Sequence, residues 1–221
     1  MRTALMRLRF VLEVMFDAVL PLRARNARTK ERKAEDIPLL PEVHDLLGSR
    51  ITTLTDYRQS AVQDLVRSLK YDGSGHAADL AATLFADFLH EEISSERTFS
   101  QKKIFIVPVP LHAGRVRERG FNQIELALKN LPQEFRDGTL ATFVPHALVR
   151  TRATKQQTRL PRSERLSNVA GAFSAPNTAI VSKAHIFLID DVTTTGATLV
   201  NAATPLRRAG AEVTLLALAR A

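Results

Sequence analysis

The sequence contains no cysteine and no tryptophan, and only two tyrosines among its 221 residues. Without cysteine the chain can form no disulfide and offers no thiolate ligands, so we expect no zinc. The lack of a disulfide framework also favours a cytoplasmic location, which we expect for this chain. The scarcity of tryptophan and tyrosine argues against a platform on which nucleic-acid bases stack.

Long uninterrupted apolar runs are missing as well. The best candidate, residues 3–20, is interrupted by Arg7, Arg9, Glu13 and Asp17, whereas a membrane-spanning helix needs about 20 mostly apolar residues. The acidic residues also argue against a signal peptide. We therefore expect no membrane span, and we interpret the run as an amphipathic helix that packs on the domain or on a partner.

The charge of the chain is unbalanced, with a formal net charge of +8. This excess suggests an anionic partner, such as a phosphorylated substrate or nucleic acid, although solubility alone explains it equally well. Residues 23–33 hold six basic side chains against the single acid Glu31, and Pro38 and Pro41 follow. We predict a connector without regular structure over residues 21–42. The expected division is an N-terminal helix and basic linker over residues 1–50, then one domain over residues 51–221.

The rest of the chain is organised around residues 186–199. Four apolar, mostly branched or aromatic residues at 186–189 predict a buried parallel strand. Asp190 and Asp191 are predicted to end that strand, and a threonine-rich turn then leads to a helix over residues 197–208. Ligands of open α/β sheets bind at this end of the strands. Because neighbouring side chains of an extended segment point in opposite directions, we expect different roles for Asp190 and Asp191.

The chemistry of this stretch suits a ribose phosphate. Carboxylates can accept hydrogen bonds from the two ring hydroxyls, and the N–H groups at a helix start suit a phosphate. Gly196 is expected to let the backbone approach the ligand closely. The simpler alternative, an acidic turn with a threonine N-cap, explains less of the order in which these features occur. The residues assigned to ribose phosphate are Asp190, Asp191, Thr193, Thr194, Thr195, Gly196, Ala197 and Thr198.

This stretch resembles the phosphoribosyl pyrophosphate (PRPP) motif of type I phosphoribosyltransferases, and further motifs resemble the ComF family of competence-type proteins. These motifs are Tyr57 with residues 69–73, residues 107–111, residues 119–123, and Arg150, Thr154, Gln157, Leu160, Arg165, Asn168, Gly171 and Phe173. The resemblance implies a doubly wound α/β fold with a mainly parallel sheet, preceded by a helical arm. ComF relatives commonly carry a four-cysteine zinc ribbon near the linker, which this sequence cannot form.

The resemblance also assigns a pyrophosphate site and a flexible loop. Lys70, at the end of a helix predicted over residues 57–69, is a candidate ligand, although a lysine at that end also complements the helix dipole. The loop after a strand predicted over residues 104–107 supplies Val109, Pro110, Leu111, His112, Arg115 and Arg119, unless these arginines are simply a surface cluster. Basic residues 148–169 match a loop that closes over PRPP, with a disordered basic loop as the alternative. Its candidate residues are Arg150, Thr154, Gln157, Arg159, Arg165 and Asn168.

Two functions remain open at this point. An enzyme would bind PRPP with Mg²⁺ and transfer phosphoribosyl to an unknown acceptor, with Asp190 and Asp191 orienting the ribose and stabilising its developing positive charge. Purine-salvage relatives often carry a carboxylate where this chain has Thr194, which makes a purine acceptor less favoured. The alternative is a non-catalytic protein that senses PRPP or handles single-stranded DNA during DNA uptake. No protein side chain is assigned to a metal, and the oligomeric state stays open, a dimer included.

Overall fold

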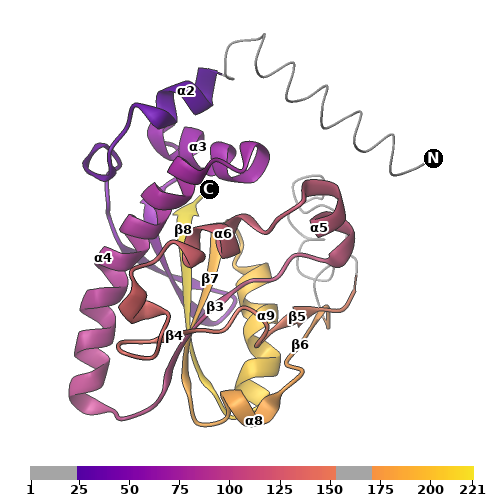
Figure 1. Ribbon diagram of the computed structural model, residues 1–221. Helices are drawn as coiled ribbons and strands as arrows, with labels where there is room; N and C mark the ends of the chain where they lie inside the picture. Colours follow the sequence, from indigo (N-terminus) through magenta and orange to yellow (C-terminus); the bar gives the residue numbers. More distant parts are fainter. Residues whose placement is uncertain (1–23, 153–170) are drawn as a thin grey trace.

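The computed structural model describes residues 24–152 and 171–221 (Figure 1). The expected N-terminal helix lies outside the described residues. So do five of the expected loop residues, namely Thr154, Gln157, Arg159, Arg165 and Asn168.

A six-stranded sheet forms the centre of the molecule, with strand order β1-β2-β8-β7-β3-β4. Every pairing is parallel except the antiparallel β1–β2 hairpin. The strands are β1 (Glu42–Leu46), β2 (Ser49–Asp56), β3 (Ile104–Pro108), β4 (Thr142–Phe143), β7 (His185–Thr193) and β8 (Glu212–Arg220). The mainly parallel α/β sheet expected from the sequence is therefore confirmed.

Helices cover both faces of this sheet, as Figure 1 shows with α4 and α9 on opposite sides. In β7, Phe187 and Ile189 pack toward α3, α4 and α6, whereas Ile186 and Leu188 pack toward α9. The alternation follows from the two-residue period of a strand, and it explains why the strand is apolar at every position. The helices on the first face are α3 (Ser60–Arg67), α4 (Gly75–Phe99) and α6 (Gln123–Lys129). The second face is covered by α8 (Thr178–Val181), α9 (Ala197–Arg208) and a two-stranded sheet of β5 (Val149–Arg150) and β6 (Phe173–Ser174). The remaining helical elements are α2 (Ala24–Lys30), η1 (Ala34–Asp36), the π-helical turn η2 (Ser68–Asp72), α5 (Ala113–Arg119) and η3 (Gln133–Phe135).

Most predicted elements are present, with shifted ends. The helix expected over residues 197–208 has those bounds, whereas the helix expected over residues 57–69 is the shorter α3, Ser60–Arg67. The prediction that Asp190 and Asp191 end their strand was wrong, because β7 continues to Thr193. Its ladder with β8 runs on to the pair Thr193 and Arg220, and this non-local pairing keeps the acidic residues extended.

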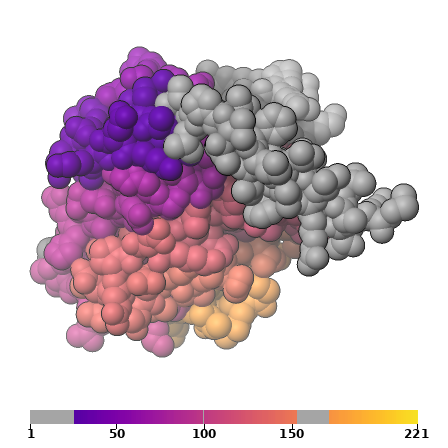
Figure 2. Space-filling view, turned by 45° about the horizontal axis from the view of Figure 1, so that its top comes forward, coloured from indigo at the N-terminus to yellow at the C-terminus, as the bar shows by residue number. Residues whose placement is uncertain are grey.

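The basic connector has more regular structure than the sequence predicted. Residues 24–30 form α2 and residues 34–36 a 3₁₀ turn, so the prediction of an irregular segment was wrong. Alanine, arginine and lysine favour helix. Two of the basic residues, Arg28 and Arg32, form ion pairs with Asp64 on α3. We call residues 24–36 the N-terminal arm. This arm packs on the domain, and Figure 2 shows its indigo surface lying directly against the purple and magenta surface.

The β1–β2 hairpin begins the sheet at Glu42, upstream of the expected boundary at residue 50. Its strands turn at Leu47 and Gly48, which both have positive φ. His44 of β1 is buried and shares a hydrogen bond of 2.9 Å with the hydroxyl of Thr53. Within residues 24–152 and 171–221, no helix is both long and apolar enough to cross a membrane.

Candidate functional site

The candidate site lies where β3 and β7 end, side by side in the sheet. The N–H of Val109, just beyond β3, donates to the carbonyl of Ile189 in β7 at 2.8 Å. This bond brings the start of the predicted pyrophosphate loop next to the acid pair at Asp190 and Asp191. Ligand sites of parallel sheets form at such an edge, because the loops diverge there.

Asp191 faces the α4 and α6 layer and is almost fully buried. Its Oδ2 accepts from the amide of Gln123 at 2.5 Å and lies 3.2 Å from the ammonium of Lys70, while its Oδ1 accepts from the N–H of Val192 at 2.6 Å. Burial by itself lowers the pKa of Lys70, but the charge and hydrogen bond of Asp191, with Asp190 behind it, raise that pKa above its ordinary value. Lys70, whose side chain is partly exposed, is therefore a cation at neutral pH held against Asp191.

Asp190 faces the opposite layer, as the strand alternation predicted. Burial first, and the charge of Asp191 second, raise the pKa of Asp190 to about 7. The N–H of Asp191, which donates at 2.9 Å, and the cations Lys70 and Arg150 oppose that rise. Arg150 lies with its guanidinium 5.2 Å from the ring centre of Phe173. The two carboxylates thus differ in their partners, and with a pKa of about 7 Asp190 is partly protonated near neutral pH.

The threonine-rich turn connects β7 to α9, and its glycine has a packing role that the sequence did not predict. Gly196 has φ 79°, and a Cβ built there would lie 2.8 Å from Cδ1 of Ile51 and 2.9 Å from Cβ of Leu46. The close approach is therefore to the hairpin, and Gly196 is required by packing and by backbone conformation. The hydroxyl of Thr195 accepts from the N–H of Ala197 at 3.4 Å, at the start of α9. Thr193 and Ala197 are buried, whereas Thr194 and Thr198 are partly exposed beside them.

The predicted pyrophosphate loop runs from Val109 into α5. Val109 is buried and its carbonyl accepts from the amide of Asn122, whereas Pro110 and Leu111 are partly exposed. His112 caps α5, since its Nδ1 accepts from the N–H of Gly114 at 3.1 Å. Its geometry makes His112 a capping residue as well as a candidate ligand.

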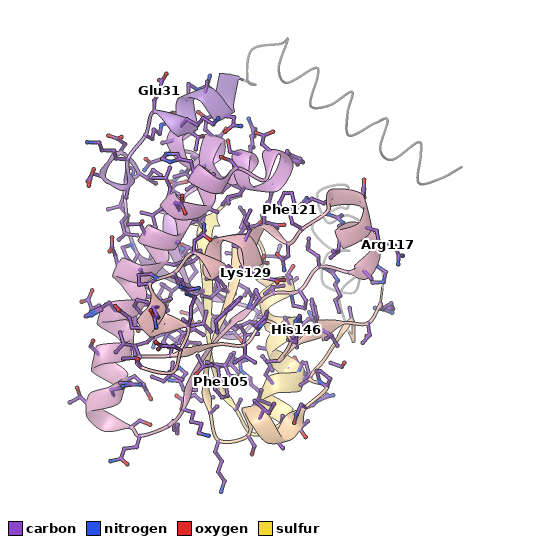
Figure 3. The ribbon with its side chains drawn as sticks, viewed as in Figure 1. Glu31, Phe105, Arg117, Phe121, Lys129 and His146 are labelled. Atoms are coloured by element: carbon purple, nitrogen blue, oxygen red, sulfur yellow. The ribbon has the colours of Figure 1, made fainter. Side chains whose placement is uncertain are left out.

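The arginines of α5 differ in where they point. Arg119 is half-buried, donates to the side chain of Gln123, and lies 5.9 Å from the ring centre of Tyr71. Arg115 is partly exposed, and Arg117 extends outward from the helix (Figure 3). Arg119 therefore joins the site around Asp191, whereas Arg117 faces solvent.

Gln123 is the site residue that the sequence analysis missed. Its amide nitrogen donates to Asp191 and its amide oxygen accepts from Arg119, so it joins the acid pair to the pyrophosphate loop. A glutamine at the first position of a helix has no distinctive pattern. Its place in the motif of residues 119–123 was the one available signal.

Within the described ranges, no group of three or more histidine, aspartate or glutamate side chains is placed to hold a metal ion. A groove of about 690 Å³ lies elsewhere, at the opposite ends of β2 and β8, where Arg50, Phe88 and Arg207 help to line it. The chemistry of the acid pair and its partners, and not that groove, locates the candidate site.

A mainly parallel, doubly wound sheet, with an acid pair on a central strand followed by a threonine-rich turn and a helix, defines a protein of the type I phosphoribosyltransferase-like class. A scan against models of known protein families finds no match. The chain is 32% identical to the DNA utilization protein YhgH of Escherichia coli over 163 residues, which cover 73% of this chain and 67% of the relative. The chain therefore belongs to the ComF family.

Other relatives carry names that refer to competence. Competence protein ComFC of Streptococcus pneumoniae is 32% identical over 152 residues, which cover 69% of this chain but only 60% of that relative's length. Competence protein F of Haemophilus influenzae is 35% identical over 122 residues, covering 52% of this chain and 50% of the relative.

Solved structures give a weak likeness. Orotate phosphoribosyltransferase of Mycobacterium tuberculosis is 13% identical with a TM-score of 0.36, covering 88% of this chain and 82% of that one. Adenine phosphoribosyltransferase of Saccharomyces cerevisiae is 15% identical with a TM-score of 0.31, covering 85% of this chain and 88% of that one. Scores this low carry no argument about function.

Proposed function

We propose that this chain binds PRPP together with Mg²⁺ and transfers its phosphoribosyl group to an acceptor. The observation that supports this proposal most is that Asp190 and Asp191 lie side by side in sequence but have different partners. Asp191 is held by Lys70 and Gln123, and Asp190 is left toward the opposite layer with a pKa near neutrality. A diol needs two such acceptors held at fixed positions.

In the proposed reaction, the bond from ribose C1 to the diphosphate oxygen breaks and its electron pair leaves with the diphosphate. The acceptor then forms a bond to C1 and loses a proton. Asp190 and Asp191 would orient the ribose hydroxyls and stabilise the positive charge that develops on the ring. Lys70 and Arg119 would offset the negative charge of the departing diphosphate.

Magnesium would arrive with the substrate. Mg²⁺ is commonly bound through one or two carboxylates and the phosphates of a substrate, and keeps several waters. The acid pair fits such partial coordination, and the diphosphate would supply the other oxygens. Thr194 cannot act as a base at neutral pH, so the acceptor's proton must leave by another group, and a purine acceptor is less favoured. A cytoplasmic location stays a prediction.

Calorimetry with PRPP and MgCl₂ tests the proposal. We expect binding by the unaltered chain and a drop in affinity of about tenfold or more for Lys70→Ala, since a charge-assisted contact to phosphate contributes about 1.5 kcal/mol or more. Lys129→Ala is the matched control, because Lys129 is an exposed lysine paired with Glu125 on α6. No binding to the unaltered chain, or an equal drop in the two variants, would reject the site.

A second proposed function is the handling of single-stranded DNA, which the relatives named for DNA utilization and the outward-facing Arg117 support. On this proposal the chain handles single-stranded DNA with little turnover, and the salt dependence of its DNA affinity provides the assay. Arg117→Ala removes one candidate cation for a phosphate, and should reduce the slope of log affinity against log salt by about one. A slope near zero for the unaltered chain would reject DNA handling through phosphates.

A further inference from the structure

An ion-pair cluster built on a buried carboxylate lies outside the candidate site, between the N-terminal arm and α3. Asp64 has a side chain only 6% exposed, and it accepts from Nε and Nη2 of Arg28 at 2.8 and 2.9 Å and from Nη1 of Arg32 at 3.1 Å. The hydrogen bond from Arg28, followed by Arg32, holds the pKa of Asp64 below its ordinary value. We call Arg28, Arg32 and Asp64 the Asp64 clamp.

The arm makes two more contacts close to the clamp. Thr29 and Ser68 share a buried hydrogen bond of 3.2 Å between their hydroxyls. The backbone carbonyl of Arg32 lies 2.9 Å from Nε2 of His76, in the first turn of α4. These attachments therefore lie before the π-helical turn η2 at Asp64, on its first residue Ser68, and after it at His76.

That turn carries Lys70. Lys70 points inward to Asp191, whereas Tyr71 beside it is 59% exposed. A π-helical turn contains one residue more than an α-helical turn, and such turns are rare and occur often at functional sites. Its end is set by Gly73, with φ 56°, where an added Cβ would lie 2.9 Å from the ring of Phe121, labelled in Figure 3. The inward direction of Lys70 thus depends on how both ends of the turn are held.

We infer that the Asp64 clamp positions Lys70: the N-terminal arm holds the π-helical turn so that the ammonium of Lys70 reaches Asp191. Asp64 and its two arginines are positioning residues, since they act on the site through the turn. The alternative is that the clamp only attaches the arm. The effect on PRPP rests on the proposed function, but the effect on Lys70 itself does not.

Nitrogen-15 NMR of the lysine ammonium groups tests the inference in the full chain. An ammonium that is ion-paired and partly shielded from water exchanges its protons more slowly than an exposed one, so Lys70 should give a distinct signal, assigned as the one that disappears in Lys70→Arg. In the Arg28→Gln, Arg32→Gln double variant we expect this signal to broaden or shift to the position of exposed lysines. Arg32→Gln alone removes one of the three hydrogen bonds, and should give a smaller change if the double variant fails to fold. Glu212→Gln is the control, because it breaks an exposed pair with Lys102 and should leave Lys70 unchanged.

PRPP binding by the same variants distinguishes the clamp inference from the proposed function. We expect the double variant to bind PRPP with MgCl₂ about tenfold more weakly, which corresponds to about 1.4 kcal/mol. A changed Lys70 signal in a protein that never binds PRPP would uphold the clamp and reject the proposed function. An unchanged Lys70 signal in the variants, even with a lower melting temperature, would overturn the inference and leave the clamp as an attachment of the arm.

Discussion

Replacing either aspartate of the acid pair by asparagine should change the stability of the fold in opposite directions. Burial and Asp191 raise the pKa of Asp190 from its ordinary 3.8 to about 7. The folded chain therefore binds this proton more tightly than the unfolded chain. Stability from this group is fully present below the unfolded value of 3.8 and is lost as the pH rises through about 7. Asp190→Asn removes the ionisation, so the variant should gain stability at alkaline pH.

The size of this gain follows from the same numbers. At about 1.4 kcal/mol for each pKa unit, the difference between 3.8 and about 7 sets an upper bound of about 4 kcal/mol. Asp190 is partly exposed, and solvent screening reduces the bound, so we expect about 2 kcal/mol at pH 8.5 and less than about 1 kcal/mol at pH 5. For a chain of this length, about 2 kcal/mol raises the melting temperature by about 4–8 °C.

Asp191→Asn provides the contrast. It removes the charge that compensates Lys70 in a buried position, and we expect stability to fall by about 2 kcal/mol, below the range for fully buried pairs because Lys70 is partly exposed. Thermal unfolding of both variants at the two pH values measures the effects. If Asp190→Asn gains nothing at pH 8.5, or gains equally at both pH values, then Asp190 is not the high-pKa group described above.

Three further predictions concern proton release, glycine and zinc. Asp190, with a pKa of about 7, is about half protonated at pH 7, and a bound diol or cation favours its ionised form. Binding of PRPP with Mg²⁺ at pH 7 should therefore release up to about half a proton; calorimetry in two buffers of different ionisation enthalpy measures it, and no release would contradict it. Gly196→Ala should lower stability by about 3 kcal/mol or more, because the new Cβ meets both the positive φ and the hairpin. Gly120→Ala, at φ 90° with nothing within 4 Å of the new Cβ, should cost only about 1 kcal/mol, and equal costs would contradict the packing role of Gly196. Purified protein should contain no stoichiometric zinc by elemental analysis, and one zinc ion per chain would refute the reasoning from absent cysteine.

The sequence predicted best what depends on local chemistry. The helix over residues 197–208 was predicted correctly, because Gly196 and Gly210 mark both of its ends. The opposite orientations of Asp190 and Asp191 followed from strand geometry alone. By contrast, the extension of β7 to Thr193 depends on pairing with Arg220, which no local pattern encodes.

The missed features share a long-range cause. Six basic residues near the N-terminus predicted a connector without regular structure. Two of them, Arg28 and Arg32, pair with Asp64, which lies more than thirty residues away in a helix that has no special motif. Gln123 is an unremarkable residue until the fold places it between Arg119 and Asp191. The packing role of Gly196 was also missed, because its neighbours Leu46 and Ile51 belong to a hairpin that was not predicted.

The strand order has a consequence for the time at which the chain can fold during synthesis. β8 follows all the other described strands in sequence, yet it lies inside the sheet between β2 and β7. The hydroxyl of Thr55 in β2 donates to the carbonyl of Leu218, 163 residues later. Contacts so distant in sequence slow folding, because a long loop must close before they form. Until residues 212–220 leave the ribosome, the edges of β2 and β7 that face β8 lack their common partner, and unpaired strand edges of this kind make a growing chain prone to aggregation.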